Sequence, residues 1–115
     1  MTEKCALFLV VFFEEPVSGR LPVKLWIKDL GKNDRGTIGK DLLFLQYNWP
    51  IGMPYARYLG SALWEMRSTI TNAIARLIFV VRNDKIIVLH AFIKKTQKTP
   101  PSEIAIALKR LKSIK

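Results

Sequence analysis

Two apolar runs in the second half of the chain, Ala73–Arg82 and Lys85–Ile93, constrain the fold more than any other feature. Both are rich in β-branched residues, and only Asn83 and Asp84 separate them. Asparagine and aspartate tolerate positive φ, which both central residues of a type I′ turn require. The pattern therefore predicts a β-hairpin with a two-residue turn.

The predicted turn sets a register for the hairpin, with Phe79 opposite Val88, Leu77 opposite His90 and Arg76 opposite Ala91. Because side chains alternate between the two faces of a strand, the hairpin residues separate into two sets. One face should hold Arg76, Ile78, Val80, Ile87, Leu89, Ala91, Ile93 and Lys95. The other should hold Leu77, Phe79, Val81, Ile86, Val88, His90, Phe92 and Lys94. The second face carries the larger aromatic residues, so we expect it to meet two helices.

The spacing of apolar residues and the capping residues predict the remaining elements. They are a strand over Leu7–Phe13, a helix from Pro22 to Leu30, a second helix capped at Asn33-Asp34 and ending at Trp49-Pro50, a short strand over Leu63–Arg67 followed by a polar turn region over Ser68–Asn72, and a last helix with Ser102 as N-cap. This order predicts one small α+β domain over residues 1–115. Its sheet should be mostly antiparallel, with two N-terminal helices and a C-terminal helix.

The composition is strongly basic, with 19 Lys and Arg residues against nine Asp and Glu and a net charge of +10. Such a charge attracts nucleic acid, an anionic membrane surface or an acidic protein. One cysteine and one histidine exclude a disulfide framework and a cysteine-ligated zinc cluster, and we expect no metal and no cofactor. The apolar run Cys5–Phe13 has nine residues, fewer than the ~20 that span a bilayer, so we expect a cytoplasmic protein outside the membrane.

Three cations should gather on one face of the sheet. If Thr71-Asn72 forms another two-residue turn, Arg67 lies opposite Arg76 in the sheet. Glu65 then falls on the same face, two residues from Arg67, and the hairpin register adds Lys95. We expect the side chain of Arg76 to be exposed on its strand. Because like charges repel, this cluster needs a bound anion or Glu65 to offset it.

Several stretches of the chain carry a family resemblance. They are Phe12-Phe13-Glu14, Gly19, Pro22-Val23, the helix over Leu25–Leu30, Leu63-Trp64-Glu65-Met66-Arg67, Arg76 inside an apolar strand, the run Val88–Pro100 and Glu103-Ile104. Together they resemble the phage-related HigB branch of the RelE/ParE toxin superfamily. The Phe-x-Lys-Lys-Thr-x-Lys-Thr-Pro pattern is the specific part, and the resemblance covers nearly the whole chain.

The resemblance implies a RelE-like fold and a toxin that cleaves mRNA in the ribosomal A site. It also implies a HigA-like antitoxin with a helix-turn-helix, which would neutralise the toxin in a hetero-oligomer. By position, Arg67, Arg76 and Lys95 match arginines of the RelE-type site. Glu65 stands where RelE has a lysine, Ala75 replaces an aromatic residue of many relatives, and the last helix contains no tyrosine. The general base and general acid are therefore not assigned by the resemblance.

RNA cleavage without a metal needs cations to stabilise the phosphorane, a base and an acid. The planar guanidinium matches phosphate oxygens, which favours Arg67 and Arg76 for charge stabilisation. Lys94 or Lys95 can act as acid or base, because crowded lysines shift their pKa. Glu65 is either a base or a salt-bridge partner, and Arg67 either binds phosphate or simply pairs with Glu65.

Other residues are assigned to RNA contacts or to packing. Contacts to the RNA backbone are expected from Arg57, Lys98 and Lys109, although ordinary solvated charges would give the same pattern. His90 is expected on the helix-facing side as a core histidine. Trp49, Tyr55 and Tyr58 lie in a loop region, where they either pack or stack on a base.

Two alternatives to the ribonuclease remain open. ParE relatives share the fold but bind and poison gyrase, which needs no ribonuclease site. A catalytically inactive homologue would bind only its antitoxin.

Overall fold

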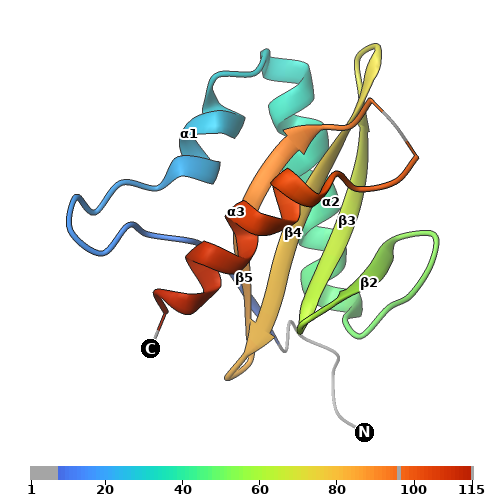
Figure 1. The fold of residues 1–115 in the computed structure, drawn as a ribbon. Helices are drawn as coiled ribbons and strands as arrows, with labels where there is room; N and C mark the ends of the chain where they lie inside the picture. The colour runs from blue at the N-terminus through green and yellow to red at the C-terminus, as the bar shows by residue number, and fades with distance from the viewer. Residues whose placement is uncertain (1–7, 96, 115) are drawn as a thin grey trace, which may run out of the picture.

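The computed structural model describes residues 8–95 and 97–114, and this part of the chain contains three helices and one five-stranded sheet (Figure 1). The elements in chain order are β1 (Leu9–Phe12), α1 (Pro22–Lys28), α2 (Lys32–Asn48), β2 (Ala56–Gly60), β3 (Leu63–Ile70), β4 (Ala73–Arg82), β5 (Lys85–Ile93) and α3 (Pro101–Lys112). The strand order is β1-β5-β4-β3-β2, and only the β1–β5 pair is parallel. The predicted α+β class with a mostly antiparallel sheet is confirmed, and the arrangement is compatible with a RelE-like fold.

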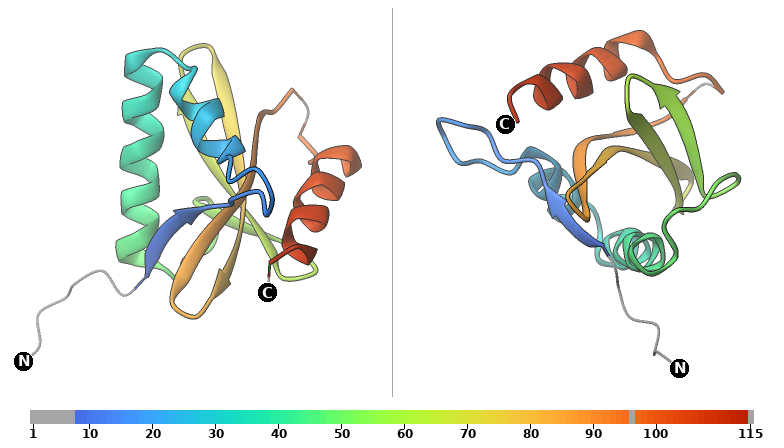
Figure 2. Two further views of the ribbon diagram at one scale, coloured as in Figure 1. Left: turned by 90° about the vertical axis from the view of Figure 1, so that its left-hand side faces the viewer. Right: turned by 90° about the horizontal axis from the view of Figure 1, so that it is seen from below.

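The sheet separates two hydrophobic cores, with α1 and α2 on one face and α3 on the other (Figure 2). The larger core, under α1 and α2, contains Val23, Ile38, Leu42, Leu45, Ala56, Met66, Ile70, Ala75, Leu77, Phe79, Ile86, Val88 and Ala91. The smaller core, under α3, contains Phe13, Leu63, Ile78, Val80, Leu89, Phe92 and Ala107. Burial of these apolar side chains on both faces is the main source of the stability of the sheet.

The turn between β4 and β5 has the predicted geometry, because Asn83 and Asp84 both adopt positive φ, at 50° and 63°. The register near the turn is also confirmed, with Phe79 opposite Val88. Beyond that pair a β-bulge shifts the register, and Ile78 pairs with His90, so that Leu89 is the additional residue.

The bulge makes the rest of the predicted register wrong. Leu77 lies opposite Ala91 rather than His90, and Arg76 lies opposite Phe92 rather than Ala91. A bulge reverses the faces of all later residues in its strand. Ala91 therefore joins the core under α1 and α2, and Phe92 joins the core under α3.

The region between α2 and the hairpin contains more strand than the sequence predicts. β3 runs to Ile70, because Ser68 is buried and donates its hydroxyl hydrogen bond to Asp41 Oδ2 on α2 at 2.5 Å. The polar turn shrinks to Thr71-Asn72, as the two-residue turn requires, and Arg67 lies opposite Arg76. β2 was not predicted, because its aromatic residue, Tyr58, was placed in a loop region.

The starts of two helices also differ from the prediction. α2 begins at Lys32 after Gly31, so Asn33-Asp34 does not cap it, and Asp34 Oδ1 instead accepts hydrogen bonds from Thr71. α3 begins at Pro101 with Pro100 as N-cap, in place of Ser102. β1 lies inside the predicted strand, of which Leu7 falls outside the described residues. In the part of the chain described, no helix is long and apolar enough to cross a membrane.

Candidate functional site

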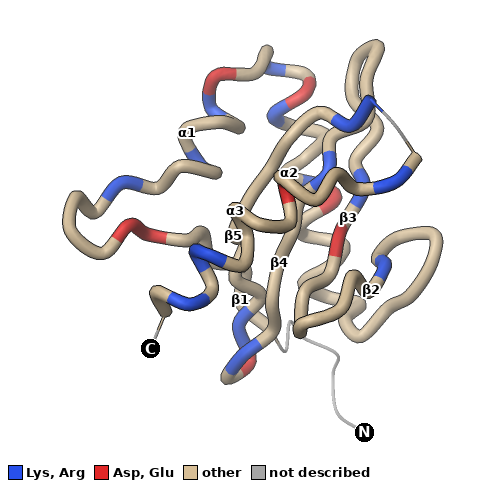
Figure 3. The backbone as a smooth tube through the Cα atoms, in the orientation of Figure 1, with Lys and Arg blue, Asp and Glu red and all other residues tan. Residues whose placement is uncertain are grey.

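A pocket of about 530 Å³ opens at the sheet where β2, β3 and β4 meet the chain that follows β5. Its lining residues, which define the basic pocket, are Met53, Pro54, Tyr55, Arg57, Glu65, Arg67, Ile74, Arg76, Lys94, Lys95 and Gln97. Five of them are cations and one is a carboxylate. Figure 3 shows blue segments on β2, on β3 and on the connection from β5 to α3, which lie on one side of the molecule.

Strand pairing explains how side chains that are distant in sequence reach the basic pocket. Arg57 on β2 is the Cα partner of Glu65 on β3, and Arg67 on β3 is the partner of Arg76 on β4. Glu65 and Arg67 are two residues apart, so they share a face of β3. The predicted convergence of Arg67, Arg76 and Glu65 is therefore seen in the structure.

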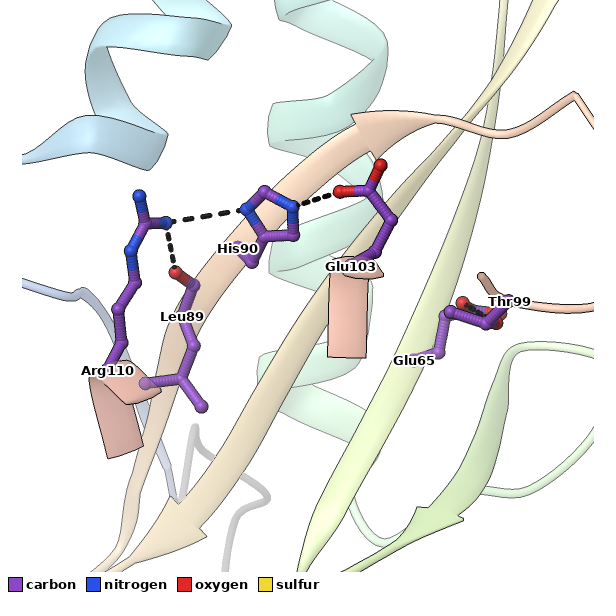
Figure 4. Close-up of polar contacts among 6 residues, drawn as sticks. All are labelled: Glu65, Leu89, His90, Thr99, Glu103 and Arg110. Atoms are coloured by element: carbon purple, nitrogen blue, oxygen red, sulfur yellow. Dashed lines mark hydrogen bonds and ion pairs between the residues drawn. The ribbon is translucent and has the colours of Figure 1, made fainter. Parts of the chain in front are cut away.

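Glu65 is the acidic centre of the basic pocket and is 2% exposed. Its Oε1 lies 3.3 Å from Nη1 of Arg76. Its Oε2 accepts a hydrogen bond of 2.5 Å from Thr99 Oγ1, and Figure 4 shows this contact of Glu65 with Thr99. Glu65 therefore pairs with Arg76 and not with Arg67. Because Glu65 is buried and bound to both Arg76 and Thr99, the geometry favours its ion-pair role over that of a general base.

Arg76 is buried, in contrast to the exposed strand arginine expected from the sequence. It is 9% exposed, and its Nε is buried with no hydrogen-bond partner within the described residues. Burial lowers the pKa of Arg76, the charge of Glu65 opposes this, and the charges of Arg67 and Arg57 lower it further. Removing the Arg76 side chain would leave Glu65 as an unpaired buried charge, so an Arg76→Ala variant is expected to be destabilised and cannot serve as a purely catalytic test.

The bulge in β5 brings Lys94 toward Arg76, although the predicted register assigns Lys94 to the opposite face. The backbone N–H of Lys94 donates to the carbonyl of Ile74 at 3.0 Å, which continues the pairing of β4 with β5. Burial lowers the pKa of the Lys94 ammonium group, and the charge of Arg76 lowers it further, while Glu65 raises it. Lys95, which the predicted register places with Arg67 and Arg76, is exposed but also lines the basic pocket.

His90 faces α3 and lies outside the basic pocket, so the prediction that it faces the two N-terminal helices is wrong. Its Nε2 lies 2.5 Å from Glu103 Oε1, and its Nδ1 lies 3.4 Å from Nη1 of Arg110 (Figure 4). The same Arg110 nitrogen donates to the carbonyl of Leu89 at 2.7 Å. Burial lowers the pKa of His90, and the contacts with Glu103 oppose this. A neutral ring that donates from Nε2 and accepts at Nδ1 fits both partners.

The three residues expected to contact the RNA backbone do not all lie in the basic pocket. Arg57 lines the basic pocket, whereas Lys98 is exposed and is not one of its lining residues. Lys109 lies on α3 and borders a different, mostly apolar hollow near Phe13 and Val17. In the chain outside residues 1–7, 96 and 115, no group of three or more His, Cys, Asp or Glu side chains is placed to hold a metal ion.

The three aromatic residues that were expected to pack or stack have different environments. Trp49 packs edge-on against Trp64 and Phe79, with ring centroids 4.9 and 5.4 Å away. Tyr58 lies against Trp64, and its hydroxyl accepts a hydrogen bond from the Ala62 N–H. Tyr55 lines the basic pocket.

Thr99 is a residue of the site that the sequence analysis missed. It enters the family resemblance only within the run Val88–Pro100, without a role, but it is buried and bonded to Glu65, 34 positions earlier in the chain. No local pattern links these two residues. The one sequence feature that indicates a functional role here is the lysine-rich run before Thr99, which belongs to the same connection between β5 and α3.

The small α+β domain, with its cationic pocket on the sheet, is compatible with a RelE-like fold. Residues 25–112 match the family model of phage-derived Gp49-like proteins (DUF891). The chain therefore belongs to this family, which is RelE-like and toxin-related. The match includes every residue of the basic pocket. No curated protein matches the chain.

The contact between Thr99 and Glu65 predicts a difference between two substitutions. Thr99→Val removes the hydroxyl donor and leaves the buried Oε2 of Glu65 without its hydrogen-bond partner. The free energy of unfolding should therefore fall by about 1–3 kcal/mol. Thr99→Ser keeps the donor and should lose much less. Urea unfolding of both variants measures this. Equal stability of the valine and serine variants would contradict the assigned hydrogen bond.

His90 predicts a pH dependence of stability. The folded pKa is lowered, so the unfolded chain binds a proton below pH about 6.5 while the folded ring stays neutral. This contribution to stability is present above pH about 6.5 and is lost as the pH falls toward the folded pKa. His90→Gln should lower the free energy of unfolding by about 1 kcal/mol at pH 7.5. It should also reduce the change in the free energy of unfolding between pH 7.5 and 5.5, as measured by urea unfolding. Parallel pH slopes for wild type and variant would refute the prediction, and Lys109→Gln on the exposed side of α3 is the control.

Proposed function

We propose that this protein is the toxin of a type II toxin–antitoxin system and acts as an mRNA endoribonuclease on translating ribosomes. The observation that carries the proposal is the basic pocket, in which five cations surround one buried carboxylate. Membership of the Gp49-like family supports a toxin-like role. Ribosome dependence is inferred from the resemblance to the RelE-type toxins.

The proposed reaction uses the RNA itself as nucleophile. The 2′-oxygen attacks the adjacent phosphorus, so that an O2′–P bond forms and the P–O5′ bond breaks. A base accepts the 2′-hydroxyl proton, and an acid gives a proton to the leaving 5′-oxygen. The products are a 2′,3′-cyclic phosphate and a 5′-hydroxyl. Negative charge increases on the non-bridging phosphate oxygens in the transition state, where fixed cations stabilise it most.

The arginines of the basic pocket are assigned to this charge stabilisation. Arg67 is exposed and can present its planar guanidinium to two phosphate oxygens. Arg76 is its cross-strand neighbour on β4, a buried charge that Glu65 holds in place. Arg57 and Lys95 contribute further contacts to the RNA backbone, and contacts of Lys98 and Lys109 with RNA stay a prediction.

Lys94 is assigned to proton transfer. A lowered pKa increases the fraction of neutral amine near neutral pH, which a general base requires, and the resulting ammonium is a stronger acid. The neighbouring arginines contribute to the shift and also attract the phosphate, so one cluster serves both roles. Glu65 is assigned as a positioning residue that orients Arg76.

The proposed partners are the ribosome with its mRNA, and a HigA-like helix-turn-helix antitoxin. A net charge of +10 favours association with polyanions such as ribosomal RNA. The same charge favours an antitoxin that presents acidic side chains to the toxin.

Substitution of the pocket cations tests this proposal. Lys94→Met and Arg67→Gln should each lower the rate of mRNA cleavage in a translating extract by about 10²–10³-fold. Both should keep the wild-type melting temperature, because neither side chain takes part in the Glu65–Arg76 pair. Cleaved mRNA should carry a 5′-hydroxyl at the downstream fragment.

The matched control is Lys85→Met, which removes an exposed lysine at the opposite end of β5. It should cleave as the wild type does. Intact mRNA together with gyrase-dependent DNA breaks would favour a ParE-like gyrase inhibitor instead. Wild-type cleavage by Lys94→Met would refute its role in proton transfer.

A further inference from the structure

We infer that Tyr55 and Phe44 form a base-stacking subsite, which binds one nucleobase of single-stranded RNA next to the phosphate in the basic pocket. The inference rests on the proposed function, because it needs an RNA phosphate in that pocket. It adds to that function a class of ligand, a nucleobase, and the two side chains that contact this ligand.

The first observation is an exposed aromatic pair. Tyr55 lies in the loop before β2 and is 49% exposed, and Phe44 lies on α2 and is 41% exposed. Their ring centroids are 4.9 Å apart, with the ring planes at 40°. The N–H of Tyr55 donates to the carbonyl of Gly52 at 3.0 Å, which holds the loop in a turn. The chain thus keeps two aromatic rings in contact at the surface, with close to half of each residue accessible to a ligand.

The second observation is the position of this pair beside the cations. Tyr55 lines the basic pocket, and it also lines a neighbouring hollow of about 290 Å³. That hollow is lined by Lys40, Asp41, Phe44, Leu45, Tyr55, Met66 and Arg67. Tyr55 and Arg67 therefore form the boundary between the two hollows. A phosphate held by Arg67 would place an attached nucleotide at the Tyr55 ring.

The chemistry of the second hollow fits a base better than a second phosphate. Phe44, Leu45 and Met66 provide an apolar wall, and the Asp41 carboxylate offsets the positive charge of Lys40 in the same lining. Single-stranded RNA is bound in many proteins by a cationic groove together with aromatic side chains on which bases stack. The two adjoining hollows supply these two parts separately.

The other exposed or partly exposed aromatic residues nearby do not provide this surface. Trp49 and Tyr58 are both in contact with Trp64, and neither lines either hollow. Tyr55 is thus the aromatic residue that connects the two hollows.

The test compares two small ligands that differ only in the base, adenosine 5′-monophosphate and ribose 5-phosphate, titrated into the purified protein at low salt. Stacking on an aromatic ring should make the nucleotide bind about tenfold more tightly than the sugar phosphate. Tyr55→Leu should remove this difference while the affinity for ribose 5-phosphate stays unchanged. Tyr55→Phe should keep it, because the ring is retained. In nuclear magnetic resonance spectra, the ring protons of Tyr55 should shift when the nucleotide is added and not when ribose 5-phosphate is added.

The control is Tyr58→Leu, which removes another exposed tyrosine and should leave both affinities unchanged. Equal affinities of the two ligands for the wild type would overturn the inference, and cleavage that still depends on Lys94 would leave the proposed function standing. If neither ligand binds, the inference fails, and the cleavage assay with Lys94→Met decides the proposed function separately. If Tyr55→Leu binds the nucleotide normally but loses the antitoxin, the aromatic pair is a protein-docking surface and the inference is wrong.

Discussion

The buried carboxylate of Glu65 is the group on which the arrangement of the site depends. A pocket with five cations would push its own side chains apart unless a negative charge lay among them. Glu65 supplies that charge and binds Arg76 with one oxygen and Thr99 with the other. It thereby joins β3, β4 and the chain that leads into α3, and it holds the buried Arg76 beside its exposed cross-strand neighbour Arg67.

The parts of the site that depend on local rules could be predicted from the sequence. Asn83-Asp84 is a turn signal in the two residues themselves, and its geometry is confirmed. The pairing of Arg67 with Arg76 follows from one short turn and from the alternation of side chains. Glu65 could therefore be assigned to the face of these arginines before any coordinates were known.

The parts that depend on packing between distant segments could not be predicted. The bulge at Leu89 lets both Leu89 and His90 face α3, and an alternating pattern gives no sign of an additional residue. Its consequence for the site is large, because it brings Lys94 toward Arg76. Thr99 reaches Glu65 through the path of the chain between β5 and α3, which no periodicity describes.

The most direct test of this view of the site is the titration of the Lys94 amine, followed by nuclear magnetic resonance of its side chain, with and without inorganic phosphate. A lysine crowded by burial and by Arg76 should have a pKa below the ordinary range of a lysine side chain. Phosphate bound among the cations should then raise the pKa of Lys94. An ordinary lysine titration of Lys94 that phosphate does not change would contradict a pocket whose cations are held together to bind a phosphate group.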